Sequence, residues 1–328
     1  MTGAATLQYT GATMKTLPLL CALVAGASSA VAADYPLKPI RIVVSETPGA
    51  GSDILARQAG SVLTEAFGQQ TVVDNRPGAS GLIGAELVAK AQPDGYTLWA
   101  MSLSQLVGTV LYQRLQVGEN FAPVSLTAQT TSAIAVNAAL PVNTVAELIA
   151  YAKARPGQVL YGSAGNVTSM HLCMEMLKLA AGVNLVHVPY KGAAPMLTDL
   201  AGGQVQAACV PVAPLQPLVK TGRLRALAVT SATRTALAPG LAPVADTLPG
   251  FELNGWYGLL APRGTPPAVV ARIHAALANG MKTPAVTDKL AAMGVEPVVS
   301  APVEFAAFLR TQTAKWQKLL QDANIRAD

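Results

Sequence analysis

Short β-branched runs alternate with segments of helical periodicity along most of the chain. The first run, Ile40 to Val44, has the continuous apolar character of a strand buried on both faces of a parallel sheet. Apolar residues then recur at helical spacing from Ile54 to Phe67, and Gly68 ends that helix. A glycine-rich loop, Ser45 to Asp53, joins the two, and Ser52 or Asp53 is the expected N-cap. Such a unit predicts an α/β fold.

The same unit repeats twice before the pattern changes. A strand over Thr71–Asp74 precedes a helix over Ile83–Ala91, and a strand over Tyr96–Met101 precedes a helix that begins at Ser102. Three units in series predict a doubly wound domain. Residues Ala122–Asn137 have strand composition without a helical period, so we expect them to carry the chain into a second domain.

A second series of alternating strands and helices begins at Thr144. Its third glycine-rich loop, Gly162 to Ser169, again opens a helix. Gly255–Ala261 then predicts a strand that returns to the first domain. Three helices that cap the first domain follow it, at Pro267–Asn279, Val286–Met293 and Val303–Gln321. The predicted fold class is α/β, with two doubly wound lobes, a cleft between them and two crossover strands.

The predicted boundaries follow from these crossings and from the N-terminus. Residues 1–33 are an upstream extension and a signal peptide, 34–130 with 254–328 form lobe 1, and 131–253 form lobe 2. Residues 14–33 have the order of a secretory signal, from Met14-Lys15 through an apolar stretch to cleavage after Ala32 or Ala33. We therefore expect a periplasmic protein, and either Met1 or Met14 as its start.

Composition narrows the possible partners. The chain is 51% hydrophobic and 12% charged, which is typical of a globular protein. Its net charge is +5, its basic residues are scattered and only 5% of residues are aromatic, so a nucleic-acid binder is not expected. A mild positive charge fits a small anionic ligand. We expect a monomer.

Two cysteines, Cys173 and Cys209, remain once Cys21 is removed with the signal peptide. An exported protein can pair them, but we predict two buried free thiols.

Loops at the carboxyl ends of parallel strands present the free N–H groups of the following helix to a ligand, and an anion is the expected guest. Gly49-Ala50-Gly51-Ser52-Asp53-Ile54 begins like a dinucleotide fingerprint, but Ile54 stands where the third glycine belongs. No lysine follows, so the loop is not a P-loop. An ordinary strand-to-helix turn remains the alternative.

Catalytic motifs are scarce. Ser163 lacks the glycine two residues before it that a nucleophile elbow needs, since Tyr161 stands there. His171, His187 and His274 show no metal-ligand spacing, so we expect packed or capping histidines, with no catalytic residue, metal or cofactor.

From Tyr35 almost to Asp328 the sequence resembles the Bug family of periplasmic solute receptors, the extracytoplasmic components of tripartite tricarboxylate transporters. The resemblance rests on segments in the family's order: PLKPIRIVV, TPGAGSDILAR, VVDNRPGASGLIGAE, AQPDGYTL, FAPVSL, GSAGNVTSMHL, VHVPYKGAAPMLTDLAGGQVQ, GRLRALAVTSATR and WYGLLAPRGTPPAVVARI. It implies a two-lobed protein that closes on small carboxylates, commonly di- or tricarboxylates, acidic amino acids or related cyclic amides. Expected partners are a small anionic or zwitterionic ligand and membrane transporter subunits.

The chain departs from the family pattern at positions that select a ligand. Family members usually carry proline, phenylalanine and proline before the first glycines, whereas Glu46 lies there in this chain. Leu82 replaces a usual asparagine, and Gln206 and Val210 replace two usual acids. One hypothesis is that Glu46 receives a cation or an N–H donor of the ligand, such as an amino or amide group. The alternative is that Glu46 points into solvent or pairs with an Arg or Lys.

The expected ligand site combines the two lobes. Its residues are Glu46, Ala50, Gly51, Ser52, Asp53, Ser102, Gly165, Asn166, Thr168, Ser169, Tyr190 and Gly192. Backbone N–H groups of Ala50 to Asp53 bind a carboxylate from one lobe, and Asn166, Thr168 and Ser169 bind it from the other. Two other functions remain open: a periplasmic sensor with the same binding fold, and an exported hydrolase or isomerase that uses Ser163 or His171.

Overall fold

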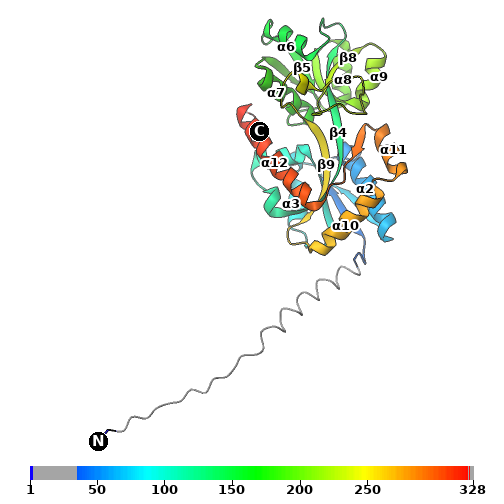
Figure 1. Cartoon of the computed structure of the whole chain (residues 1–328), viewed down its shortest axis with the longest axis vertical. Helices are drawn as coiled ribbons and strands as arrows, with labels where there is room; N and C mark the ends of the chain where they lie inside the picture. The colour runs from blue at the N-terminus through cyan, green and yellow to red at the C-terminus, as the bar shows by residue number, and fades with distance from the viewer. Residues whose placement is uncertain (3–34, 324, 326–328) are drawn as a thin grey trace.

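The protein consists of two α/β lobes joined by long strands, as the computed structural model shows (Figure 1). The structure describes residues 1–2, 35–323 and 325. The predicted signal peptide and Cys21 lie outside these residues.

The strands of the described chain form one continuous path, β2-β1-β3-β9-β4-β7-β5-β6, while β10 and β8 also pair with β4. The strands are β1 Ile40–Val44, β2 Thr71–Asn75, β3 Thr97–Ser102, β4 Phe121–Asn137, β5 Val159–Ser163, β6 Leu185–Pro189, β7 Ala207–Pro211, β8 Leu224–Val229, β9 Asn254–Pro262 and β10 Val295–Pro297.

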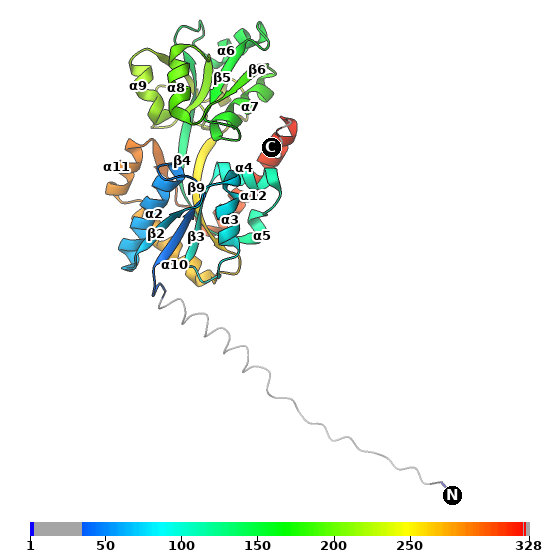
Figure 2. The same cartoon turned by 180° about the vertical axis from the view of Figure 1, so that it is seen from behind.

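Helices cover both faces of each half of this sheet (Figures 1 and 2). They are α2 Gly51–Phe67, α3 Leu82–Ala89, α4 Leu103–Tyr112, α5 Val117–Asn120, α6 Val145–Lys153, α7 Ser169–Ala181, α8 Ala193–Gly202, α9 Val212–Lys220, α10 Pro267–Gly280, α11 Pro284–Ala292 and α12 Pro302–Asp322, with 3₁₀ turns η1 Ala79–Gly81 and η2 Val244–Asp246. Helix α2 begins at Gly51 with Ala50 as N-cap, so the prediction that Ser52 or Asp53 caps it is wrong.

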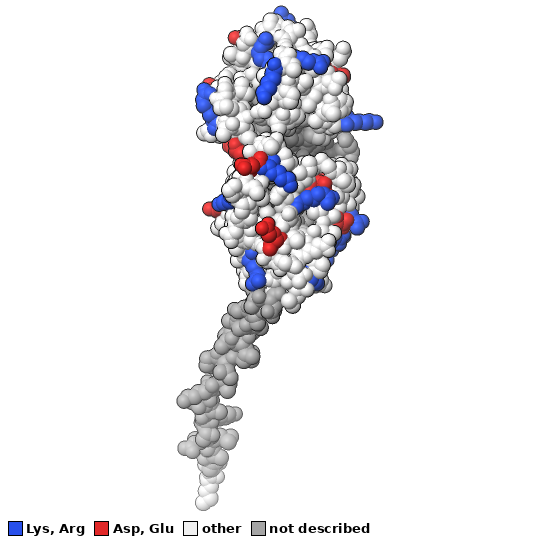
Figure 3. All heavy atoms as spheres, turned by 90° about the vertical axis from the view of Figure 1, so that its right-hand side faces the viewer, with Lys and Arg blue, Asp and Glu red and all other residues white. Residues whose placement is uncertain are grey.

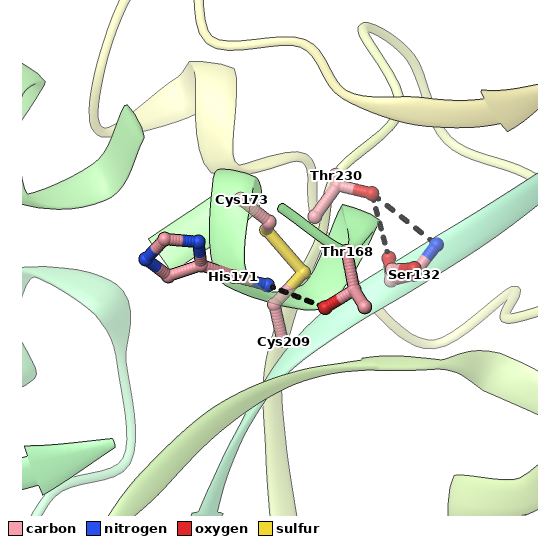
Figure 4. Close-up of a disulfide and its surroundings, with 6 residues drawn as sticks. All are labelled: Ser132, Thr168, His171, Cys173, Cys209 and Thr230. Atoms are coloured by element: carbon pink, nitrogen blue, oxygen red, sulfur yellow. Dashed lines mark hydrogen bonds between the residues drawn. A yellow bond between two sulfur atoms is a disulfide. The ribbon is translucent and has the colours of Figure 1, made fainter. Parts of the chain in front are cut away.

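Strand β4 belongs to both lobes. It pairs with β9 as far as Thr131, opposite Asn254, and with β7 from Ser132, opposite Pro211. Ser132 also accepts the N–H of Thr230, whose hydroxyl contacts the Ser132 backbone (Figure 4). The predicted crossings at Ala122–Asn137 and Gly255–Ala261 are therefore β4 and β9.

Strand direction places the carboxyl ends of the parallel strands of both lobes opposite each other. Strand β9 is antiparallel to both β3 and β4, so β3 and its parallel neighbours β1 and β2 point toward lobe 2. Strand β7 is antiparallel to β4, so β7, β5 and β6 point back toward lobe 1. Helices α2, α4 and α7 start at these facing ends.

The register of the strands paired with β9 and β4 gives the distance, along β4, between the facing strand ends of the two lobes. Ser102 at the end of β3 lies opposite Tyr257, which lies opposite Ala128 of β4. On the lobe 2 side, Pro211 at the end of β7 lies opposite Ser132. Ser132 lies four positions after Ala128 along the extended strand β4, which corresponds to a rise of about 13 Å.

Large aromatic side chains fill the interior of both lobes. Trp99, Phe121, Trp256 and Phe305 are almost fully buried in lobe 1, and Tyr161 is buried in lobe 2. The C-terminal helices cap lobe 1 as expected, since α10 packs on α2, α11 on β10, and α12 on β4 and α4.

Cys173 of α7 and Cys209 of β7 form a disulfide, with their Cα atoms 6.1 Å apart (Figure 4). The prediction of two free thiols is therefore wrong. Both residues are buried as expected. The packing of α7 against β7 brings them together, and their separation of 36 residues in the sequence gives no sign of that contact.

Candidate functional site

The first part of the site is the N-terminus of α2 in lobe 1. Ala50 has an extended backbone and its side chain caps nothing, so the first N–H groups of α2 have no intrahelical acceptor. Gly51 is exposed, whereas Ser52 and Asp53 are 2% and 3% exposed. The side chains of Ser52 and Asp53 are engaged within lobe 1, so neither is free to bind a ligand.

The side chain of Asp53 holds the loop that precedes α2. It accepts the Gly49 N–H at 2.9 Å and the Asn75 side-chain amide at 3.0 Å, and it pairs with Arg57. Burial alone would raise the pKa of Asp53, but hydrogen bonds from Arg57, Gly49 and Asn75 hold that pKa below its ordinary value. Asp53 stays ionised and fixes the glycine-rich turn.

Glu46 lies beside this turn and is half-buried. Its two carboxylate oxygens accept hydrogen bonds from the Ser52 hydroxyl at 2.5 Å and from the Gln105 amide at 2.7 Å. The ion pairs found among the described residues do not involve Glu46. The alternative that Glu46 pairs with an Arg or Lys is therefore wrong, and neutral donors hold the carboxylate in place.

Tyr257 of β9 is a site residue that the sequence did not reveal. Its hydroxyl lies 2.6 Å from the position that a Cβ on Gly51 would occupy, so it borders the α2 N-terminus directly. Burial, and secondly the charge of Glu46, raise the pKa of Tyr257 to about 12, so the hydroxyl stays protonated. Only the register of the crossing strand brings Tyr257 to this place.

Ser102 closes the same corner at the start of α4. It is buried, and its N–H donates to the Gln105 side-chain oxygen at 2.7 Å. Gln105 thus links the α4 N-terminus to Glu46. Ser102 therefore helps to fix Gln105, which in turn holds Glu46.

The second part of the site is the N-terminus of α7 in lobe 2. Thr168 caps the helix, since its hydroxyl accepts the His171 N–H at 3.4 Å (Figure 4). The same hydroxyl donates to the Gly165 carbonyl at 2.8 Å. Asn166 is exposed and Ser169 is half-buried. Gly165 and Val167 both have positive φ, of 131° and 60°, which turns this loop sharply.

The loop that leads into α8 supports the α7 loop. Tyr190 donates its N–H to Ser163 at 3.0 Å, and Gly192 donates its N–H to Ala164 at 3.2 Å. The Tyr190 hydroxyl donates to Asp199 at 2.9 Å, so it is already engaged. Tyr190 and Gly192 therefore lie beside the predicted lobe 2 residues, but their described contacts are internal.

Ser163 contacts a histidine that sequence spacing did not disclose. Its hydroxyl lies 2.7 Å from Nε2 of His187, whose ring contacts the rings of Tyr161 and His171 at centroid distances of 4.9 and 4.1 Å. The Tyr161 and His171 rings are themselves 6.4 Å apart, so the three rings form one cluster. Ser163 is fully buried, and burial lowers the pKa of His187 to about 4. A buried serine under stacked rings gives a substrate no approach, so this pair is part of the packing, as expected for the histidines.

The described residues contain no cluster of three or more His, Cys, Asp or Glu side chains arranged to hold a metal. Among the same residues, no helix combines the length and the apolar character needed to cross a bilayer. On the face shown in Figure 3, basic and acidic side chains are interspersed.

A large hollow of the described chain lies elsewhere. It is a groove of about 1550 Å³ in lobe 1, between the α4–α5 segment and α12, and its walls include Phe121, Arg263 and Arg310. It contains none of the predicted ligand residues. We therefore take the facing helix N-termini, and not this groove, as the candidate site.

Two α/β lobes, two crossing strands and helix N-termini that face each other define the class of two-lobed solute-binding proteins. A family model described as "Tripartite tricarboxylate transporter family receptor" matches residues 55–325, and the chain belongs to this family. The family comprises periplasmic solute-binding receptors rather than enzymes, which confirms both the resemblance and the expectation of a non-enzymatic protein.

Similar proteins include one relative and two structures with ligands. Protein BugT of Bordetella pertussis is 32% identical over 308 residues, which cover 92% of this chain and 94% of BugT. A structure of R. palustris Rpa4515 with adipate is 35% identical with a TM-score of 0.77, covering 89% of this chain and 99% of that one. MatC from Rhodopseudomonas palustris with bound malate is 27% identical with a TM-score of 0.73, covering 87% and 100%.

Proposed function

We propose that this protein is an exported receptor that captures a small carboxylate between its lobes and delivers it to a membrane transporter of the tripartite tricarboxylate type. The observation that carries the proposal is the opposition of two helix N-termini, α2 from lobe 1 and α7 from lobe 2, at strand ends about 13 Å apart along β4. Both ends favour negative charge. The adipate and malate complexes of similar proteins support a carboxylate ligand.

Binding in this proposal is a closure without chemistry. Lobe 1, residues 34–130 with 254–328, and lobe 2, residues 131–253, close about the points where β4 changes partner, Thr131–Ser132, and where the chain returns, Leu253–Asn254. The N–H groups of Gly51 to Asp53 meet the ligand from lobe 1, and Asn166, Thr168 and Ser169 meet it from lobe 2. The predicted N–H of Ala50 is not among them, because it already donates to the Thr47 carbonyl at 3.2 Å. Charge-assisted hydrogen bonds contribute roughly 1.5 to 3 kcal/mol each. Three or four such hydrogen bonds, after the free-energy costs of association and closure are subtracted, are compatible with micromolar affinity. That affinity needs about 8 kcal/mol of binding free energy.

Glu46 narrows the ligand class within this proposal. A carboxylate next to an anion site opposes a plain dicarboxylate by about 1 kcal/mol at 4 Å in water, and by about 4 kcal/mol at an effective dielectric constant of 20. Glu46 has no cationic side-chain partner among the described residues, and neutral donors fix its position. An ammonium or amide N–H on the ligand provides the missing donor. We therefore expect an amino acid or amide.

The function is tested by titrating the purified protein with a panel of plain dicarboxylates, acidic amino acids and their amides, by calorimetry and by melting temperature. A saturable complex with a raised melting temperature supports the receptor. Failure of every carboxylate to bind, or turnover of any of them, overturns the proposal. Uptake of the bound compound in a deletion strain separates transport from sensing.

The role of Glu46 is tested by the same panel on Glu46→Gln. The variant keeps both side-chain hydrogen bonds within reach but removes the charge. We expect it to lose at least about tenfold in affinity for amino-bearing ligands and to gain for plain dicarboxylates. An unchanged order of preference would show that Glu46 has no part in selection. Glu86→Gln, on α3 and paired with Lys90 and Arg114, is the matched charge control.

A further inference from the structure

Two imidazole rings lie directly behind the α7 loop of lobe 2. His171 and His187 stack at a centroid distance of 4.1 Å with an angle of 17° between their planes. Each ring contacts the loop: Nδ1 of His171 accepts the Val167 N–H at 3.1 Å, and Nε2 of His187 contacts the Ser163 hydroxyl at 2.7 Å. The Ser163 oxygen in turn accepts the Gly165 N–H at 3.1 Å. The rings therefore hold both ends of the segment from Ser163 to Thr168.

The contact between Val167 and His171 fixes a protonation state. A backbone N–H is only a donor, so Nδ1 of His171 must carry a lone pair, and its proton must be on Nε2. His171 stands at the third position of α7, where a Glu or Gln side chain accepts a backbone N–H in an ordinary capping box. If Nδ1 carried a proton, two N–H donors would face each other at this contact, and the loop would have to move.

The surroundings of the rings keep them neutral. Charged and titratable groups face them from α7 and β5, namely Glu175, Lys178 and Tyr161. Nε2 of His171 lies 3.9 Å from Glu175, which is itself engaged by Lys178 and by the Tyr161 hydroxyl. Burial lowers the pKa of His171, and burial with the neighbouring ring lowers that of His187. At both rings, burial lowers the pKa by more than the negative charge of Glu175 raises it.

We propose that His171 is a positioning residue for the ligand site: as a neutral Nδ1 acceptor, with His187 stacked behind it, it holds Val167 at positive φ and so aims the Asn166–Ser169 segment into the cleft. This inference rests on the proposed function, because it concerns the lobe 2 half of the same site. It makes capture of a carboxylate sensitive to acid. Protonation of His171 removes the acceptor, so affinity falls as pH decreases below the ordinary range of histidine.

The test uses adipate and L-aspartate as probes, with dissociation constants measured from about pH 7.5 to about pH 4.5. His171→Asn keeps an acceptor oxygen at the place of Nδ1 but does not titrate. His171→Phe keeps the stacked ring but removes the acceptor. Expressing each wild-type constant as a ratio to the His171→Asn constant at the same pH removes the titration of the probe itself.

We expect His171→Asn to bind within about threefold of wild type near pH 7.5, and His171→Phe to bind about tenfold more weakly, the effect of one lost hydrogen bond. On acidification the wild-type affinity should fall relative to His171→Asn. A ratio that stays constant, or that rises because a protonated ring attracts the anion, would overturn the proposal. Equal affinities of His171→Phe and wild type would overturn it as well.

A readout without ligand separates this inference from the proposed function. Nitrogen-15 spectra of the free protein should show His171 with its proton on Nε2, and amide exchange of residues 163–168 should be faster in His171→Phe than in His171→Asn. If no carboxylate binds the wild type, the proposed function fails while these two measurements still decide the role of His171. The opposite tautomer overturns the inference, even where His171→Phe does not fold.

Discussion

Removing the disulfide between Cys173 and Cys209 is expected to destabilise lobe 2 without changing the ligand site. The bond closes a loop of 36 residues in the sequence, and the loss of chain entropy in the unfolded state then amounts to about 4 kcal/mol at 25 °C. Both cysteines are buried, so serine in their place would leave a buried hydroxyl. The variant is therefore Cys173→Ala with Cys209→Ala. The two residues lie on α7 and β7, and although Figure 4 shows Thr168 and His171 beside the disulfide, the described hydrogen bonds of Thr168 do not involve either cysteine.

The size of the effect on melting temperature depends on how the lobes unfold. With an unfolding entropy of about 2.1 cal/mol/K per residue, 4 kcal/mol corresponds to about 7 °C if some 290 residues unfold together. It corresponds to about 16 °C if the roughly 120 residues of lobe 2 unfold alone. Scanning calorimetry of the double variant therefore also reports whether the two lobes unfold cooperatively, as one unit.

Thiol titration is the check on the bond itself. In a Cys21→Ser background, protein denatured without reductant should show no free thiol, and reduced protein should show two. Two free thiols before reduction would refute the pairing. An unchanged melting temperature in the double variant would refute the entropy argument, and loss of ligand affinity at unchanged structure would refute the separation of the disulfide from the site.

Two further predictions concern the helix N-termini. Gly51→Val should weaken carboxylate binding by about a hundredfold, because a branched side chain obstructs the α2 N–H groups, while Gly240→Val, at an open surface position, should bind normally. The new Cβ also meets the Tyr257 hydroxyl, so the experiment is repeated with Tyr257→Phe, and restored binding there would mean that displacement of Tyr257 was the cause. Thr168→Ala with Ser169→Ala should cost more affinity than the roughly 1 kcal/mol of a lost cap. Thr144→Ala, which removes the cap of α6, is the control, and a fall in melting temperature with unchanged affinity would make both residues structural.

The elements and the family of this protein were predictable from its sequence because they depend on local order. The strand, loop and helix units read from Ile40 to Ser102 are β1 to β3 with their helices, and the long apolar segment from Ala122 is the crossing strand β4. Glycine-rich loops before α2 and α7 marked both helix N-termini. Period, glycine position and capping residues all act within a few neighbours along the chain.

Contacts between distant segments decided the rest. The approach of Tyr257 to Gly51 follows from the register of β9. The contact of Glu46 with Gln105 follows from the pairing of β1 with β3, because Glu46 follows β1 and α4 follows β3. The pairing of Cys173 with Cys209, and the stacking of His171 on His187, follow from the way α7 lies on its sheet. No periodicity records which residues face each other after the chain has crossed between lobes, because register and packing are set by the whole core at once.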